Sequence, residues 1–205
     1  MKRYIAALLI SAFSIGTAVA HSGGTNSQGC HNDHKNGTYH CHWNWNLIMI
    51  EAIDSWIDNT LTKFYKDRNS CEILHPHYKG YYSKEFLAQS YFVIIDEIPK
   101  PDFPELYEAG LGGFLSMDLE GITYKDTYFI KTDMVSKLDL HFHELVHVAQ
   151  LQQLGSIGFI KRYINELKQF EYREAPLEKM AYFLQEEHYL QDKKLDVLHY
   201  VKNHL

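Results

Sequence analysis

The string His-Glu-Leu-Val-His at residues 143–147 constrains the fold of this chain more than any other feature of its sequence. The periodicity of residues 137–154 predicts a helix, and on a helix the two histidines lie one turn apart on the same face. Apolar residues flank the string on both sides, so the helix is expected to be buried. Ionisable groups on a buried helix are costly unless they are paired or bind a metal. The string therefore predicts a metal site inside the protein.

His143 and His147 are the expected ligands. Two imidazoles with this spacing can bind one zinc ion through ring nitrogens at ~2.0–2.1 Å. Glu144 projects beside them, where it can act as a general base on the water that the metal activates. Catalytic zinc sites use three protein ligands and leave one position open for water, so a third ligand is expected elsewhere in the chain.

The third ligand is expected in the segment that follows, at residues 171–182. Pro176 indicates the first turn of a helix, which places Glu178 near the helix N-terminus. A carboxylate is favoured there by the helix dipole. We therefore expect Glu178 to be the third ligand, with Glu174 as the first alternative and Glu171 as the second.

These residues together resemble the gluzincin branch of the zincin metallopeptidases, and more narrowly a group of small bacterial zincin-like proteins. The similarity covers about residues 121–185, and its most specific parts are HELVHVAQ and APLEKMAY. It implies a zincin-like α+β fold, with a small antiparallel or mixed sheet packed on the site helix and on further helices. It also implies Zn²⁺ bound by His143, His147 and Glu178, with Glu144 as the general base. The substrate would be a peptide or protein that pairs with the edge strand before the site helix.

The sequence departs from two longer motifs of related metallopeptidases. No Gly-x-x-His follows His147, as it does in metzincins, and the thermolysin-like Asn-Glu-x-x-x-Asp is replaced by LEKMA at residues 177–181. Asp139 or another carboxylate is therefore expected to orient the ligating histidines. The candidates for stabilising an oxyanion are Tyr172, Tyr182 and His188.

Hydrophobic patterns in the rest of the chain predict an α+β fold with little sheet. The segment with His75, Pro76 and His77 is expected to be a loop, and prolines 99, 101 and 104 indicate a connection. Helices are expected at 44–66, 83–90, 158–170 and 176–189, a strand at 91–95, and a strand or hairpin at 121–131.

Residues 1–20 have the features of a signal peptide. Lys2 and Arg3 precede an apolar run, which ends at the small-residue pattern Ala18-Val19-Ala20. We expect the protein to be exported to the periplasm or secreted, with no membrane association after cleavage; an uncleaved N-terminal anchor is the alternative. Residues 43–205 would then form the metallopeptidase domain, and residues 21–42 a separate module.

This module is rich in histidine and cysteine and almost lacks aliphatic residues, so it cannot build a core. Its end, YHCH at residues 39–42, resembles a short bacterial module that ends in Tyr-His-x-His. In an oxidising compartment Cys30 and Cys41 are the natural disulfide pair because they close a short loop, and Cys71 is left as a free or intermolecular thiol. Three interpretations remain: a disulfide-closed loop with incidental histidines, a tract that loads or buffers metal, and a copper site that uses the free amine of His21.

The charge balance narrows the function further. The chain has 20 basic and 26 acidic residues and a formal net charge of −6. Without a basic stripe, it is a poor candidate for binding nucleic acid or an anionic membrane surface. We therefore expect a zinc-dependent peptidase. The alternatives are a non-catalytic exported protein that stores or delivers zinc and, with less support, an interaction domain with a structural zinc.

Overall fold

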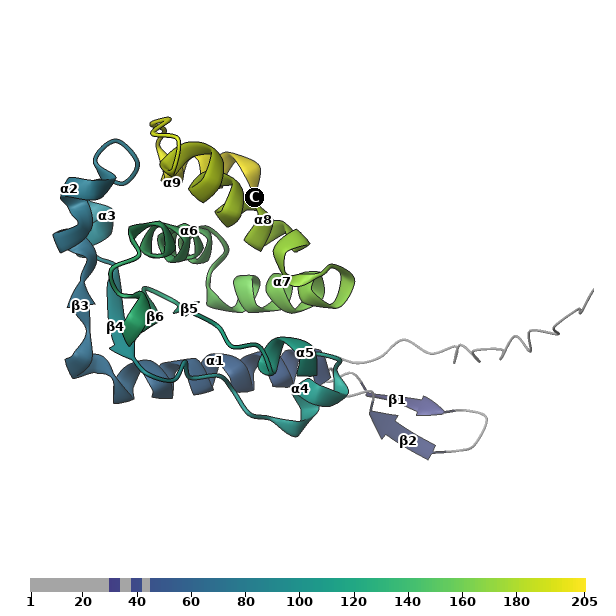
Figure 1. Cartoon of the computed structure of the whole chain (residues 1–205). Helices are drawn as coiled ribbons and strands as arrows, with labels where there is room; N and C mark the ends of the chain where they lie inside the picture. Colours follow the sequence, from purple (N-terminus) through teal and green to yellow (C-terminus); the bar gives the residue numbers. More distant parts are fainter. Residues whose placement is uncertain (1–29, 34–37, 42–44) are drawn as a thin grey trace, which may run out of the picture. The chain divides into compact units, whose positions relative to one another are not determined.

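The computed structural model describes residues 30–33, 38–41 and 45–205. The chain divides after Asn44 into two compact units. The first contains a hairpin of β1 (Cys30–Asp33) and β2 (Thr38–Cys41), and the second runs from Trp45 to Leu205 (Figure 1). In the part of the chain that is described, no helix has both the length and the apolar character needed to cross a membrane. The predicted signal peptide lies outside the described residues.

The cysteines fall in both units. The antiparallel register of the hairpin places Cys30 opposite Cys41, and Cα atoms opposed in this way are ~4.5–5.5 Å apart, a spacing that a disulfide can span. The disulfide itself stays a prediction. Cys71, in the larger unit, is a free thiol that is fully buried. Burial raises its pKa to about 12, which makes it unreactive and removes it from intermolecular pairing.

A four-stranded mixed sheet with the strand order β3-β4-β6-β5 is the centre of the larger unit. β5 and β6 are the hairpin expected at residues 121–131; their two-residue turn places Lys125 at a φ of 55°. The strands are β3 (Asn69–Ser70), antiparallel to β4 (Tyr91–Ile95), which is parallel to β6 (Thr127–Lys131), which is antiparallel to β5 (Gly121–Tyr124). β5 therefore forms one edge of this sheet.

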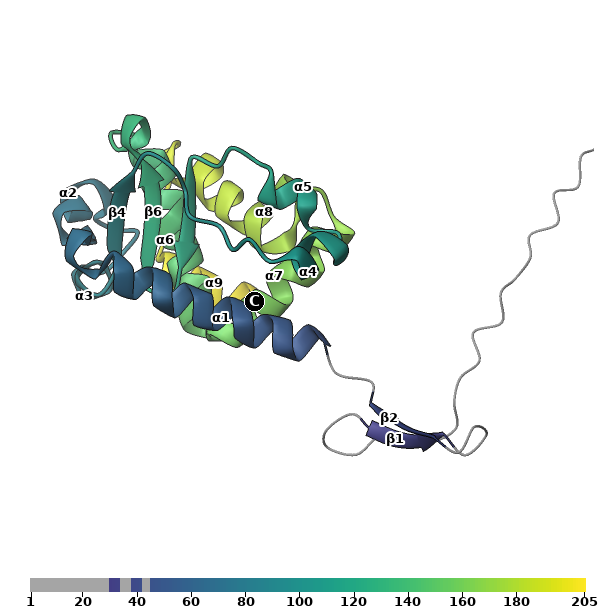
Figure 2. The same cartoon turned by 90° about the horizontal axis from the view of Figure 1, so that it is seen from below.

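Helices cover the two faces of the sheet (Figures 1 and 2). α1 (Trp45–Lys63) packs with Val93 and Phe129, whereas α6 (Leu138–Leu154) packs with their neighbours Phe92 and Tyr128. Successive strand residues point to opposite faces, so apolar side chains at consecutive positions require two covered faces. This arrangement confirms the α+β fold that the sequence predicted.

Among the shorter elements, the structure corrects one prediction, the loop expected at residues 75–77. His75, Pro76 and His77 do not lie in a loop but in the short helix α2 (His75–Tyr78), where Pro76 occupies the first turn and its missing N–H costs nothing. The proline-marked connection also contains two short helices, α4 (Pro104–Glu108) and α5 (Gly112–Leu115), that the sequence did not indicate. The other α-helices are α3 (Lys84–Ala88), α7 (Ser156–Gln169), α8 (Pro176–Phe183) and α9 (Val197–His204), and a π-helical segment (Leu184–Tyr189) follows α8.

Candidate metal centre

The helix α6 is enclosed by the protein along most of its length. Every residue from His141 to Leu151 is buried, because α6 packs against the sheet on one side and against α7, α8 and α9 on others. His143, Glu144 and His147 expose only 3%, 4% and 5% of their surface. The expectation that this string lies on a buried helix is confirmed.

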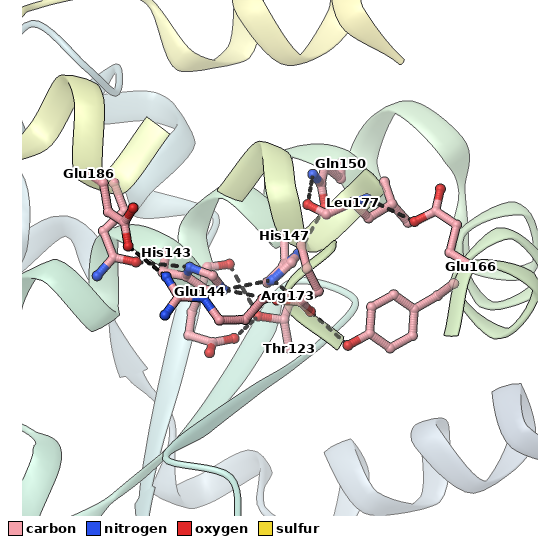
Figure 3. Close-up of polar contacts among 12 residues, drawn as sticks. Thr123, His143, Glu144, His147, Gln150, Glu166, Arg173, Leu177 and Glu186 are labelled. Atoms are coloured by element: carbon pink, nitrogen blue, oxygen red, sulfur yellow. Dashed lines mark hydrogen bonds and ion pairs between the residues drawn. The ribbon is translucent and has the colours of Figure 1, made fainter. Parts of the chain in front are cut away.

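The two histidines converge with Glu178 on one point. The Nε2 atoms of His143 and His147 are 3.1 Å apart, and they lie 3.4 Å from different carboxylate oxygens of Glu178, Oε2 for His143 and Oε1 for His147. Ligand atoms at ~2.0–2.1 Å from a tetrahedral zinc are ~3.3–3.4 Å from one another. The separations between the side chains are close to these values, so the three residues are placed to hold a metal ion. Figure 3 shows both imidazoles projecting from α6 toward this point.

Glu178 comes from the first turn of α8 and is 1% exposed. Its Oε1 accepts a hydrogen bond of 2.7 Å from the hydroxyl of Tyr163, but its Oε2 has no hydrogen-bond donor among the described residues. A buried carboxylate oxygen without a donor is costly, and a bound cation would satisfy it. Glu174, in contrast, is exposed and pairs with Lys179, and Glu171 is exposed as well. The structure thus brings Glu178, and neither alternative, to the histidines.

Nearby charged groups together outweigh the effect of burial on the pKa values of His147 and Glu178. Burial alone would raise the pKa of Glu178, but the two histidines hold it well below its usual range. Burial alone would lower the pKa of His147, but the carboxylates of Glu178 and Glu144 raise it to about 9. Without a metal, His147 and Glu178 therefore form a buried ion pair. A divalent cation would take the place of the proton on His147.

Glu144 is positioned from β5, the edge strand. Its Oε2 accepts a hydrogen bond of 2.6 Å from the hydroxyl of Thr123, and burial raises the pKa of its carboxyl group. Its Oε1 lies where a Cβ on Gly121 would be only 2.5 Å away. Gly121 therefore provides the space that Glu144 occupies. Sequence reasoning did not identify Thr123 or Gly121, since both lie about twenty residues before Glu144 and carry no motif of their own.

The direct partners of the histidines are glutamines. His143 Nδ1 lies 3.0 Å from Oε1 of Gln185, and His147 Nδ1 lies 2.9 Å from Oε1 of Gln150. The expectation that a carboxylate such as Asp139 contacts the histidines is wrong. Asp139 instead accepts a hydrogen bond of 3.2 Å from Nε2 of Gln185, so it is linked to His143 only through this glutamine.

The triad lies between a larger cleft and a smaller cavity, both of which are partly open to solvent. The cleft, of about 700 Å³, is lined by His143, Glu144, Tyr172 and Tyr182 among others. The cavity, of about 100 Å³, is mostly apolar and lies among residues of α1, α5, α7 and β5, with Glu144, His147 and Glu178 at its polar end. Two of the three candidates for stabilising an oxyanion thus line the cleft. The third, His188, has its Nδ1 against the backbone oxygen of Lys193 instead.

No protein-family model, curated protein or solved structure matches this chain. The assignment of the site therefore rests on its geometry. One ligand atom from each of His143, His147 and Glu178 lies within 4.8 Å of the others, and all three residues are buried. These residues form a candidate His₂Glu metal site in an α+β protein.

Proposed function

We propose that this chain is an exported zinc-dependent peptidase that hydrolyses peptide bonds in peptide or protein substrates. One observation carries the proposal: a buried carboxylate outside the ligand triad, Glu144, is held beside the triad and lines an open cleft. A protein that only stores zinc has no need for such a group. The resemblance to zincin metallopeptidases in the sequence supports the same assignment.

His143, His147 and Glu178 would hold the zinc ion. The donor set of two imidazoles and one carboxylate is one that catalytic zinc sites use. When bound, the ion would act as a Lewis acid that polarises the substrate carbonyl and makes water more acidic. The raised pKa of His147 means that metal binding at neutral pH displaces a proton from this ring.

Glu144 would move the proton. Thr123 donates to Oε2, which leaves Oε1 to take a proton from the attacking water. Because burial raises the pKa of Glu144, its carboxylate is a stronger base than an exposed one and is closer to the optimum for proton transfer near neutral pH. After attack on the carbonyl carbon, Glu144 would pass the proton to the nitrogen of the leaving amine, and the C–N bond would break.

The substrate would lie in the cleft along β5. This strand forms an edge of the sheet, and its first residue, Gly121, lines both the cleft and the cavity. An extended peptide can add to such an edge through backbone hydrogen bonds. Tyr172 and Tyr182 also line the cleft, and one of their hydroxyl groups would donate to the oxyanion.

The exchange Glu144→Gln tests this proposal. The amide keeps an oxygen that can accept from Thr123 but cannot act as a base, so we expect one zinc per chain, as in the parent, and a loss of peptide cleavage of at least ~10²-fold. Zinc content and cleavage of a peptide library would be measured on both proteins. Zinc binding by the parent without cleavage of any peptide would favour the storage or delivery protein. Absence of zinc from a protein that contains the intact triad would refute both.

A further inference from the structure

Each histidine of the triad belongs to a hydrogen-bonded chain that ends on an obligate acceptor. From His147 the chain runs through Gln150, whose Nε2 donates to the backbone oxygen of Leu177 at 2.9 Å. From His143 it runs through Gln185, whose Nε2 donates to Oδ2 of Asp139 at 3.2 Å. Figure 3 shows the first of these chains, from His147 to Leu177.

The ends of the chains fix their direction. A backbone carbonyl and a carboxylate can only accept hydrogen bonds, so each glutamine must present its NH₂ group to them. Its amide oxygen then faces the imidazole, and an amide oxygen can only accept. The proton must therefore be on Nδ1 of His143 and on Nδ1 of His147. In the neutral ring this leaves the lone pair on Nε2, the atom that points to the shared point of the triad.

The glutamines also link α6 to α8 and to the π-helical segment that follows α8. Gln150 lies on α6, three residues after His147, is fully buried, and reaches the first turn of α8, where Leu177 precedes Glu178. Gln185 lies in the π-helical segment after α8 and reaches back to the first turn of α6. π-Helical turns are rare in proteins, and those that occur are often found at functional sites.

We propose that Gln150 and Gln185 are positioning residues that fix the Nδ1–H form of both histidines and the relative placement of α6 and α8. This inference rests on the proposed metal site. A carboxylate in the place of either glutamine would also orient the ring, but it would add a negative charge next to the metal. The neutral amides add no negative charge to those of Glu178 and Glu144, so that the bound ion stays a stronger Lewis acid.

The variants Gln150→Met and Gln185→Met test the proposal, with Gln152→Met as a matched control on the exposed side of α6. Methionine keeps the length of the side chain and removes both hydrogen bonds. We expect zinc affinity to fall ~10–100-fold in each of the two test variants and to stay unchanged in the control. Gln185 is only half-buried, so its variant should fold even if Gln150→Met does not.

Two further measurements separate an orienting role from a merely structural one. In the metal-free protein, at a pH high enough for both rings to be neutral, nitrogen-15 NMR of the imidazoles should show protons on Nδ1 of both histidines in the parent, and partial transfer to Nε2 for the affected ring in each variant. The double variant Gln185→Glu with Asp139→Asn restores the hydrogen-bonded chain. The amide introduced at position 139 would donate to the carboxylate introduced at position 185, so the hydrogen bond between these two residues is kept with its direction reversed. We expect the double variant to regain the zinc affinity lost in Gln185→Met, while Gln185→Glu alone places two carboxylates together and does not.

The outcomes are distinguishable from those for the proposed function. Zinc affinities and ring protonation can be measured whether or not a peptide is cleaved, and ring protonation can be measured even if zinc does not bind. Parental zinc affinity together with unchanged Nδ1 protonation in both test variants would overturn the inference. So would a loss of zinc affinity in Gln152→Met as large as the loss in the two test variants.

Discussion

Gly121 gives the sharpest test of how the chain positions Glu144. In Gly121→Ala the new Cβ would lie 2.5 Å from Glu144 Oε1 and 3.0 Å from its Cδ. An ordinary contact between carbon and oxygen is ~3.3–3.6 Å, so the carboxylate must move by about 1 Å. The hydrogen bond of 2.6 Å from Thr123 cannot be kept through such a movement. Glu144 would thus leave its position beside the triad.

The three atoms nearest to this methyl group all belong to Glu144, and none belongs to a ligand side chain. We therefore expect Gly121→Ala to bind one zinc with nearly parental affinity and to lose ~10²-fold in kcat/KM, the effect of misplacing a catalytic group by ~1 Å. Overpacking of this kind also costs ~1–3 kcal/mol of stability, which should lower the Tm by a few degrees.

Zinc titration, kcat/KM on a cleaved peptide and thermal unfolding would be measured in parallel. Gly113→Ala is the matched control, because a Cβ there meets no atom within 4 Å. Parental kcat/KM in Gly121→Ala would refute the reasoning, since it would mean that catalysis does not depend on the position of Glu144. Loss of zinc in a folded variant would equally contradict the separation of base and ligands.

Three other predictions concern the metal and its support. Saturation with zinc at ~100 times its Kd should stabilise the protein by ~2.7 kcal/mol, a rise of roughly 5–10 °C in Tm for a chain of this size, and a chelator should reverse it. The pKa of His147 is raised from 6.5 to about 9, so the stability that this group gives the metal-free protein should be complete below pH 6.5 and lost as the pH rises through 9. Over the same range the zinc affinity should rise roughly tenfold per pH unit, because fewer protons compete for the ring. Thermal unfolding of the metal-free protein and zinc titration, each repeated across this pH range, would measure the two effects. Glu166 accepts from the backbone N–H of Leu177 at 2.8 Å, at the start of the helix that carries Glu178; Glu166→Ala should cost ~1–2 kcal/mol in denaturant unfolding and weaken zinc binding, whereas an unchanged zinc affinity would show that Glu178 is positioned without it.

The sequence was most informative about features that lie within a single helix or a single hairpin. The spacing of His143 and His147 on a helix follows from the helical repeat, and the apolar flank of the string predicted its burial correctly. The hairpin of β5 and β6 is likewise a local structure. Pro176 at a helix start also located Glu178 correctly, because a helix N-terminus is indicated by a few neighbouring residues.

Tertiary structure decided everything that depends on contacts between elements. Only the packing of α8 against α6 shows that Glu178, and not Glu174, reaches the histidines, and the fit of Thr123 and Gly121 around Glu144 required the register of β5. The same holds for the glutamines, where the sequence predicted a carboxylate. A glutamine has no charge pattern and no preferred spacing to reveal it, and a side chain can act as a hydrogen-bond partner from any element that folding brings within about 3 Å. Local periodicity therefore determined the helix that carries the candidate metal site, and the packing of distant segments determined the surroundings of its side chains.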